Sequence, residues 1–534
     1  MIDHEQYRFG SARWAEHSEI ANTGLLNGSG VQVGYLNNRP ITLDTDAPMI
    51  TIAGAGSGKM RDLLAMAVSK NANKRNFILD PRGEIASVTM PSFAFAKAKV
   101  FCWNPFGVVG LPQHSINPLD ILDWDSPLFH TTCKFIADDL IETSGSANGR
   151  YFELRAREWL ENLIKALVER EREISYPKLF RVINMIEGDS EGWANFLEFM
   201  LNSSLESVRR TASEMLTKQQ DSEKEFGSII GEIYAHVTRL DDPKVLTSLE
   251  RSDVSLKDMC EGEEPMTIYL VVPAEFLGLL APVIRNMISV QVQYKSRFPA
   301  ARPIYMIVDE AGQLGNFEAL LRAFTYGRGA GVRVWALFQD VGQIVKNYGA
   351  PTLQSFMGSA AKRQFFGVRD FHTAQMVSEM LGHQTLEYDD TLAQAAARKQ
   401  KMTSAMGMLS GSDPFEAFAE YRYQNLAATN RTKQTRALMS PDEVLSMPED
   451  KQILFISGQN LYPVLADKRP YYTRRKFVGR FLPNPYHPPT DSMVIPQFFG
   501  TRRVRVISES PTYPYSELPQ YWDRPFKYIE GFRP

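Results

Sequence analysis

The sequence has few of the residues that mark secreted or metal-binding proteins. Its 534 residues include three cysteines, Cys102, Cys133 and Cys260, which lie far apart and form no CxxC pair. This spacing excludes a disulfide framework and favours a reducing compartment. The eight histidines form neither an HExxH motif nor a Cys/His zinc pattern, so we expect no structural metal.

Long apolar runs and a strong charge of one sign are also missing. The polar first 17 residues do not resemble a secretory signal. The most apolar stretch, residues 268–284, contains Glu275 and two prolines and is shorter than the roughly 20 apolar residues that span a bilayer. We expect a buried strand and a core helix there, and no segment that spans a membrane unaided. The net charge of −3 gives no overall basic field for nucleic acid.

Two parts of the chain show apolar, strand-like runs that alternate with helical patterns. The predicted strands are 48–53, 266–272, 303–310, 332–340, 360–367 and 451–457, together with a strand that ends in a turn within 75–85. This alternation predicts α/β organisation with parallel strands. The length alone predicts two to four domains.

Strand signals nearly vanish between residues 125 and 260. Residues 151–171 place Phe152, Trp159 and Leu163 on one face of an amphipathic helix, and helical patterns continue beyond them. We therefore predict an all-α domain inserted into an α/β domain. The predicted boundaries are 1–124 and 261–480 for the discontinuous α/β domain and 125–260 for the insertion.

Two further segments lack a regular pattern. Residues 395–435 are polar and contain scattered glycine and serine, which predicts a mobile loop. Residues 481–534 are rich in proline and tyrosine, and prolines disfavour helices and central strands. We predict an irregular, extended tail that docks on a neighbouring surface.

A glycine-rich loop joins the strand at 48–53 to a helical pattern. Backbone N–H groups of such a loop hold phosphate oxygens, and the helix N-terminus adds a positive end. The predicted nucleotide-binding residues are Gly54, Gly56, Ser57, Gly58, Lys59 and Met60. The loop departs from the pattern G-x-x-x-x-G-K-[ST], because Ala53 replaces the first glycine and Met60 replaces the hydroxyl residue that contacts Mg²⁺.

Polar residues follow two other predicted strands. Asp309 and Glu310 end an apolar strand, where an aspartate can orient Mg²⁺ through water and a glutamate can polarise the attacking water of an ATPase. Gln339 ends the strand at 332–340, where an amide beside the γ-phosphate can sense hydrolysis. Arg328 lies in "YGRGAG", which we interpret as a tight surface turn from which an arginine reaches a neighbour's phosphates.

These residues and several other ordered motifs resemble one family. The motifs are "RFGSARWA", "AGAGSGKM", "ILDPRGEI", "IVDEAGQLG", "YGRGAGVRVWALFQDVGQI" and "RPYYTRRKF". Together they resemble the TraG-type coupling proteins of conjugative type IV secretion systems, within the FtsK-like, RecA-fold motors. The likeness covers roughly residues 8 to 480. Lys59, Asp309, Glu310, Arg328 and Gln339 match the family's ATPase positions.

The resemblance implies a P-loop nucleotide-binding domain with an inserted all-α domain. It implies a ring, usually a hexamer, at the cytoplasmic face of the bacterial inner membrane, next to the other components of the secretion system. It also implies ATP with Mg²⁺ as cofactors, and delivery of relaxase-bound single-stranded DNA, effector proteins or both. Members usually begin with transmembrane helices, whereas this chain starts where their soluble part starts. This indicates either a soluble subclass or a trimmed chain.

Three interpretations of function remain from the sequence. The leading one is a ring-forming ATPase, with hydrolysis slowed because Met60 cannot coordinate Mg²⁺ through its side chain. The second is a recruitment adaptor that uses ATP only for assembly, and the third is a double-stranded DNA pump, against which the helical insertion argues. Residues 125–260 hold 17 Lys and Arg against 25 Asp and Glu, a net charge of −8, which suits a protein partner better than phosphates.

Overall fold

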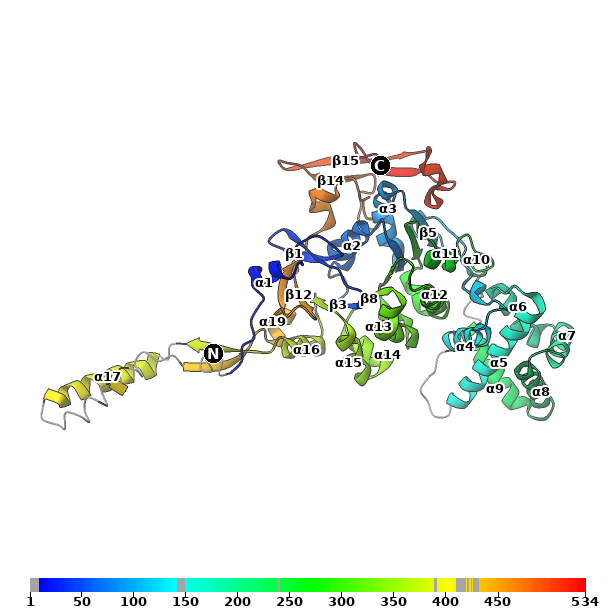
Figure 1. The fold of residues 1–534 in the computed structure, drawn as a ribbon, viewed down its shortest axis with the longest axis horizontal. Helices are drawn as coiled ribbons and strands as arrows, with labels where there is room; N and C mark the ends of the chain where they lie inside the picture. The colour runs from blue at the N-terminus through cyan, green and yellow to red at the C-terminus, as the bar shows by residue number, and fades with distance from the viewer. Residues whose placement is uncertain are drawn as a thin grey trace.

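The structure is a computed structural model that describes residues 9–141, 149–237, 241–388, 391–409 and 432–534, together with 419, 422, 423 and 425. Figure 1 shows a central α/β body, a group of helices at one side, a narrow arm at the other and a small sheet that carries the C-terminus. This arrangement confirms the predicted fold class, an α/β nucleotide-binding domain with a helical insertion.

The body is built on one 11-stranded mixed sheet with the order β2-β1-β13-β12-β9-β3-β8-β7-β4-β6-β5. The parallel strands are β3 (Met49–Ala53), β4 (Arg75–Leu79), β5 (Lys99–Trp103), β6 (Met266–Leu270), β7 (Ile304–Val308), β8 (Val332–Phe338) and β9 (Lys362–Phe366). The antiparallel extension is β12 (Lys451–Ile456), β13 (Val464–Asp467), β1 (Val31–Leu36) and β2 (Arg39–Leu43). All seven predicted strands are present.

Helices cover both faces of this sheet, which is why its central strands are mostly apolar and are buried along their whole length. One face packs on α2 (Ala65–Lys70) and α3 (Glu84–Ala96). The other packs on α12 (Leu277–Arg297), α13 (Glu318–Ala330), α14 (Val341–Tyr348), α15 (Ala350–Ser359) and α16 (Phe371–Leu381). Short helices α1 (His17–Asn22) and α19 (Pro441–Leu445) complete the body.

Helix α12 is the segment that the apolar stretch 268–284 predicted. Within the described residues, Ala274–Arg297 is the one stretch long and apolar enough to cross a membrane by length and composition. However, 72% of that window is buried inside the protein. It therefore forms a core helix behind strand β6, as predicted.

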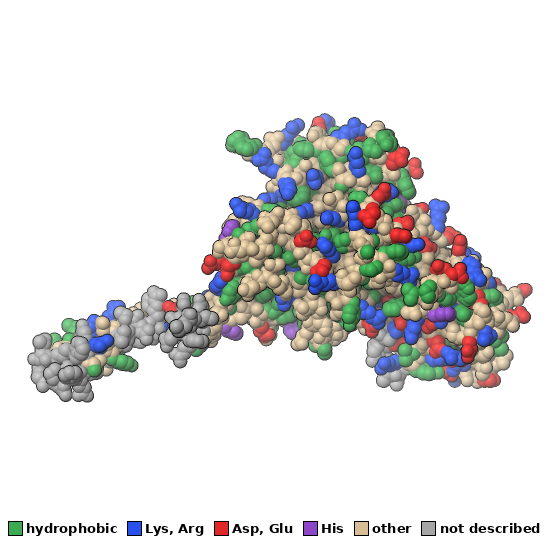
Figure 2. Space-filling view, in the orientation of Figure 1, with side chains coloured by type: hydrophobic (Ala, Val, Ile, Leu, Met, Phe, Trp, Pro, Cys, Tyr) green, Lys and Arg blue, Asp and Glu red, His purple; other side chains and the backbone are tan. Residues whose placement is uncertain are grey.

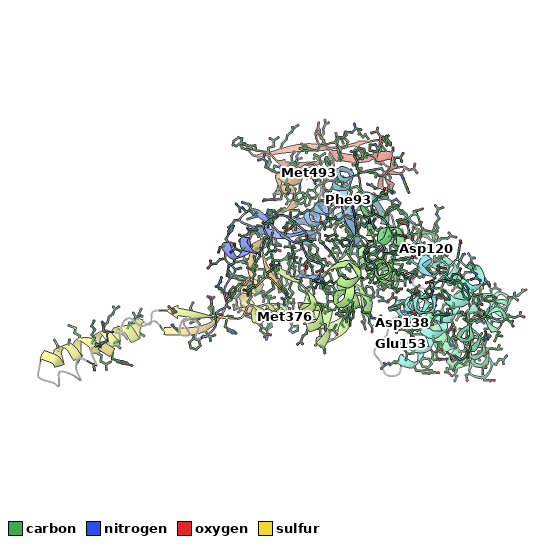
Figure 3. The ribbon with its side chains drawn as sticks, in the orientation of Figure 1. Phe93, Asp120, Asp138, Glu153, Met376 and Met493 are labelled. Atoms are coloured by element: carbon green, nitrogen blue, oxygen red, sulfur yellow. The ribbon has the colours of Figure 1, made fainter. Side chains whose placement is uncertain are left out.

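The described part of residues 125–260 is helical throughout, as predicted. Its helices are α4 (Phe129–Leu140), α5 (Gly149–Glu171), α6 (Tyr176–Gly188), α7 (Ser190–Leu201), α8 (Glu206–Asp221), α9 (Glu223–Val237), α10 (Pro243–Ser248) and α11 (Leu256–Glu261). Trp159, Leu160 and Leu163 of α5 are fully buried, as the amphipathic pattern predicted. In Figure 3, Asp138 on α4 and Glu153 on α5 lie close together, because these two helices pack side by side.

Two predicted irregular segments are helical instead. Residues 391–409 form α17 (Thr391–Leu409), which extends along the arm beyond β10 (His383–Tyr388) and β11 (Thr432–Ala437). The prediction of a mobile loop was wrong for 395–409, because its alanines, lysines and glutamines favour a helix despite the scattered serine and glycine. The rest of the predicted loop, up to the start of β11, falls mostly outside the described residues.

The stretch "YGRGAG" is also helical. It forms the last turns of α13, and only Gly331, just beyond the helix, has a left-handed backbone, with φ +78°. The prediction of a tight surface turn was therefore wrong. A Cβ atom at Gly327 would lie 3.4 Å from the Val332 carbonyl oxygen, an ordinary contact, so the packing of α13 on β8 does not require glycine there.

The C-terminal segment, residues 481–534, contains a three-stranded antiparallel sheet, so the prediction of an irregular tail was wrong. The strands are β14 (Ser492–Pro496), β15 (Thr501–Glu509) and β16 (Phe526–Ile529), in the order β14-β15-β16. Ile495, Val504 and Ile529 form its small buried core. The prolines do not interrupt it, because they lie before β14, at its end, or between β15 and β16.

The C-terminal segment docks on the chain's own α/β body. The Gln520 side chain makes two hydrogen bonds to the backbone of the edge strand β5 and the residue before it. It accepts from the Val100 N–H at 2.9 Å and donates to the Ala98 carbonyl at 3.0 Å. Tyr521 and Phe526 are buried there. The segment therefore packs on its own chain, and docking on a neighbouring surface stays a prediction.

Candidate nucleotide-binding site

The glycine-rich loop connects β3 to a helix that starts at Lys59. A Cβ atom at Gly54 would lie 2.4 Å from the Gly367 carbonyl oxygen, so only glycine fits at this position. Gly56 and Gly58 have left-handed backbones, with φ of +70° and +86°, which turn the loop back into the helix. The first turn, Lys59–Leu64, is a π-helix, a form that is frequent at functional sites.

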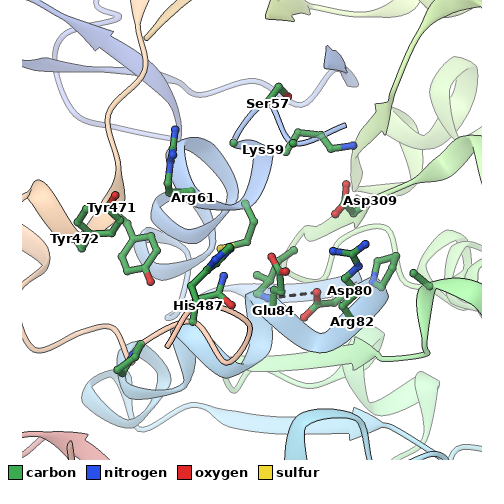
Figure 4. Close-up of a pocket in the computed structure, with 18 of the residues that line it drawn as sticks. Ser57, Lys59, Arg61, Asp80, Arg82, Glu84, Asp309, Tyr471, Tyr472 and His487 are labelled. Carbon is green, nitrogen blue, oxygen red and sulfur yellow. Dashed lines mark hydrogen bonds between the residues drawn. The ribbon is translucent and has the colours of Figure 1, made fainter. Parts of the chain in front are cut away.

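A cleft of about 890 Å³ opens at this loop, and we call it the nucleotide cleft. It contains most of the predicted site residues: Gly56, Ser57, Gly58, Lys59, Met60, Asp309, Glu310 and Gln339. Three further groups line it as well: Asp80 and Arg82 from the connection between β4 and α3, and Glu84 at the start of α3. Figure 4 shows Lys59 and Asp309 at one side and Tyr471 and Tyr472 at the other.

Three predicted residues form one chain of polar contacts in this cleft. Lys59 Nζ lies 2.7 Å from Glu310 Oε1, and Gln339 Nε2 donates to Glu310 Oε2 at 2.7 Å. Glu310 has a left-handed backbone, with φ +55°, which is uncommon for a residue with a side chain and is found at active sites. The loop lysine, the candidate base and the candidate sensor therefore meet at one point.

Asp309 sits beside this chain at the end of β7. Its Oδ1 accepts from the Glu310 N–H at 3.1 Å. Burial raises the pKa of the Asp309 carboxyl to about 6, while the Lys59 charge opposes that shift. Asp80, at the end of the neighbouring strand β4, is buried and accepts from the Ala86 N–H at 2.8 Å. Burial raises the pKa of Asp80 well above its usual range.

The loop residues fit a nucleotide phosphate. The Ser57 hydroxyl is buried, and no described group lies within hydrogen-bond distance of it. A phosphate oxygen is an acceptor that this hydroxyl can satisfy. Lys59 and the N-terminal end of the helix supply positive charge on the same side.

Two predicted residues lie outside the cleft lining. Gly54 acts through backbone packing against Gly367. Arg328 projects from α13, and its Nε lies 2.7 Å from Asp46 Oδ2 in an exposed ion pair. Arg328 contributes nothing to the cleft of its own chain.

The opposite wall of the cleft comes from residues far along the chain. Tyr471 and Tyr472 line it beside Arg61, and the C-terminal segment adds His487 and Arg503. Tyr486 donates its hydroxyl to the Arg82 carbonyl at 3.0 Å, which holds this segment over the cleft. No local pattern links these residues to the loop, whereas Asp80 follows a buried strand as Asp309 does and could have been predicted in the same way.

Lys468 contacts the glycine-rich loop and holds it in place. It is buried at the end of β13, donates to the Ser57 carbonyl at 2.6 Å and lies 3.6 Å from Asp62 Oδ2. Burial lowers the pKa of Lys468, and the Asp62 carboxylate opposes that shift. Lys468 is therefore a positioning residue that ties the antiparallel part of the sheet to the phosphate loop.

We expect Lys468→Met to weaken ATP binding about tenfold, because the loop carbonyl and Asp62 lose a buried charged partner. Calorimetry with ATP and a thermal unfolding curve would check this. Lys451→Met is the matched control, since it removes an ion pair of 2.6 Å with Asp467 on the same part of the sheet. Equal ATP affinity in the two variants would contradict a role for Lys468 at the loop.

Comparison with known proteins identifies the family. The model of the family described as type IV secretory system conjugative DNA transfer matches residues 13–410 and 416–492. The chain belongs to this family. It is 21% identical over 519 residues to a conjugal transfer protein TraG of Escherichia coli, which covers 88% of this chain and 77% of that protein. It is 23% identical to the type IV secretion system-coupling protein VirD4 of Bartonella quintana, covering 74% and 58%.

Solved structures agree on the fold. The bacterial conjugative coupling protein TrwB superposes with a TM-score of 0.59 at 15% identity, covering 86% of this chain and 93% of that one. TrwB has been solved with the ATP analogue ADPNP, at a TM-score of 0.58, and with ADP and Mg²⁺, at 0.59. The family and its coupling role in type IV secretion are thus as the sequence motifs predicted.

Proposed function

We propose that this coupling protein is a ring-forming ATPase that recruits relaxase-bound single-stranded DNA, effector proteins or both, and delivers them to a type IV secretion channel. The observation that carries the proposal is the contact chain Lys59–Glu310–Gln339 in the nucleotide cleft. A recruitment protein needs the phosphate loop alone, whereas a carboxylate held between the loop lysine and a strand-end amide suits attack by water.

Each side chain of the cleft has a distinct role in this proposal. Lys59 leaves Glu310 and binds the β- and γ-phosphates, which frees Glu310 to orient and deprotonate the attacking water. Gln339 is hydrogen-bonded to Glu310 and directly follows β8. Its amide senses whether the γ-phosphate is present, and a change in its contacts is passed on to β8. Asp309, which lines the cleft, would hold the Mg²⁺ that accompanies ATP. The bound Mg²⁺·ATP supplies the reactive phosphoryl group and its charge neutralisation.

Met60 gives the site its particular character. Its side chain lines the cleft and packs partly against the buried groups behind the loop. It cannot ligate Mg²⁺ as a serine or threonine would. We propose slow hydrolysis for this reason.

The purine base lies toward Arg61 and Tyr472 in this proposal. Tyr472 is 42% exposed and lines the cleft, so its ring is available for stacking, while Tyr471 is buried behind it. The base would then contact a wall that the chain's own residues beyond 470 build.

The proposed assembly follows from Arg328. It is 67% exposed on the side chain and lies outside its own cleft, as a residue that completes a neighbouring subunit's site must. A hexameric ring at the cytoplasmic face of the inner membrane, in contact with secretion system components, satisfies this requirement. We also propose the predicted domain division, with residues 125–260 as the inserted domain, and its net charge of −8 favours a protein partner.

We expect Lys59→Ala to abolish measurable ATP binding, because a charge-assisted contact to phosphate is lost. The loss is about 2–4 kcal/mol, or roughly 30- to 1,000-fold in affinity. Calorimetry with Mg²⁺·ATP would measure it. Lys74→Ala, an exposed lysine beyond α2, is the control. Equal affinity for Lys59→Ala and the unmodified chain would show that the site is assigned wrongly.

A recruitment adaptor that binds ATP without turnover is the second candidate, and Met60 is the observation that favours it. The two candidates agree on ATP binding and differ on hydrolysis.

A further inference from the structure

The free end of the β14–β15 hairpin carries two exposed aromatic side chains. Phe498 and Phe499 lie in the turn that joins the strands and are 74% and 85% exposed. The Gln497 N–H donates to the Gly500 carbonyl at 3.0 Å, which closes the turn beneath them. In Figure 2, hydrophobic atoms project at the upper left of the molecule, where Figure 1 places the end of this hairpin. Exposed apolar groups of this size mark an interaction site.

The two rings form a wedge and not a flat platform. Their centroids are 4.8 Å apart, and the ring planes meet at 76°. The Arg475 guanidinium lies 5.1 Å from the centroid of the Phe498 ring and covers one of its faces. Bases of a single strand stack on open, successive ring faces, and this arrangement does not offer them.

Basic side chains surround the wedge. Residues 474–505 contain seven Lys and Arg and one acidic residue, Asp491. Arg475 and Arg502 are exposed near the tip, and Lys476 is exposed next to Arg475 in the chain. Arg505 is the partner of Glu530 at 3.3 Å, so it is already paired. The apolar side chains at the tip and the basic side chains around them complement a surface on which anionic groups cover an apolar layer.

We infer that the tip of the β14–β15 hairpin inserts into the surface of an anionic lipid bilayer. Phe498 and Phe499 enter the boundary between headgroups and acyl chains, where aromatic side chains are favoured. Arg475, Lys476 and Arg502 contact the lipid phosphates, which adds electrostatic attraction. The inference does not depend on whether the cleft hydrolyses ATP.

The hairpin also connects this surface to the nucleotide cleft. Val494 of β14 and Arg503 of β15 are directly paired, and both line the cleft. The Phe pair lies only a few residues further along the same strands, on the order of 10–15 Å at the rise of a β-strand. The C-terminal segment thus reaches from the cleft to the proposed lipid contact.

The test is co-sedimentation of the full chain with vesicles of phosphatidylcholine alone or of phosphatidylcholine with phosphatidylglycerol. We expect binding only to the anionic vesicles, weakened by added salt. Phe498→Ser/Phe499→Ser and Lys476→Glu/Arg502→Glu should each reduce the affinity at least about tenfold. Phe371→Ser is the matched control, because Phe371 is 61% exposed and lies on helix α16, outside the hairpin.

A second variant keeps the test independent of folding defects. In Phe499→Trp, the fluorescence of the introduced indole is measured. Vesicles with brominated acyl chains should quench this fluorescence, because the indole enters the bilayer. Equal vesicle binding by the Phe498→Ser/Phe499→Ser variant, or an unquenched Phe499→Trp, would overturn the inference. A third outcome would also overturn it: the Phe498→Ser/Phe499→Ser variant binds vesicles normally but no longer binds single-stranded oligonucleotides, or no longer self-associates. The tip would then bind nucleic acid or a second copy of the chain.

Discussion

Glu310→Gln is expected to bind ATP as tightly as the unmodified chain and to lose about 10²- to 10⁴-fold in turnover. The glutamine side chain has the same shape, and its one carbonyl oxygen can still accept from Lys59. Its amide NH2 then donates to the Gln339 side-chain oxygen, which requires the Gln339 amide to turn over from its present contact. The introduced glutamine cannot take a proton from the attacking water. Steady-state phosphate release together with calorimetry would separate the two effects.

Glu318→Gln is the control for this prediction, because Glu318 is an exposed carboxylate near the start of α13 with a comparable charge. Its turnover should be unchanged. If Glu310→Gln retains full turnover, Glu310 is not the base. If the unmodified chain shows no turnover above the Glu310→Gln level, the recruitment adaptor is the better account.

Arg328→Ala is expected to keep ATP affinity and to lose about 10³-fold in turnover, because a cation that stabilises the transition-state charge is removed. The residue projects from α13 and lies outside its own cleft, where it pairs with Asp46. Donation to a neighbouring subunit needs that exposed pair to open, which is cheap for a surface ion pair. Arg322→Ala, six residues earlier on the same helix and also exposed, is the control.

A mixing experiment separates donation between subunits from action within one. Arg328→Ala subunits keep an intact cleft, and Lys59→Ala subunits keep an intact arginine. Rings that contain both should recover part of the activity, because one type can complement the other across an interface. Mixtures that demonstrably co-assemble without any recovery would show that Arg328 acts within its own subunit or is structural.

Much of the candidate site could be predicted because it lies at the carboxyl ends of parallel strands. Each of Lys59, Asp309 and Gln339 follows a short apolar run that forms a buried strand, and parallel strands bring such residues to one edge. Asp80 follows the same rule on β4. Asp80 lies in the motif "ILDPRGEI", which carries the family resemblance, but the sequence analysis did not predict it as a site residue.

The rest of the site depends on contacts between residues hundreds of positions apart. Lys468 reaches Ser57, and Tyr486 reaches Arg82, through packing that no local pattern encodes. The wall formed by Tyr472 and the C-terminal segment was missed for that reason. Local propensity also misled at Arg328, because tertiary packing of α13 against β8 outweighs the helix-weakening glycines around it.

The C-terminal segment shows the limit of composition as a guide. Its prolines predicted irregular structure, but they lie outside the strand interiors or at an edge strand, where proline is tolerated. The alternation of Val504 and Val506 with arginines on β15 was the signal for a strand.

The central claim is that this coupling protein uses ATP hydrolysis, and not ATP binding alone, to deliver its substrate. The most direct measurement is substrate transfer from cells whose only copy of the protein carries Glu310→Gln, with assembly and ATP binding verified for the variant. The account predicts that transfer is lost although the protein assembles and binds ATP. Transfer at the unmodified level would contradict it.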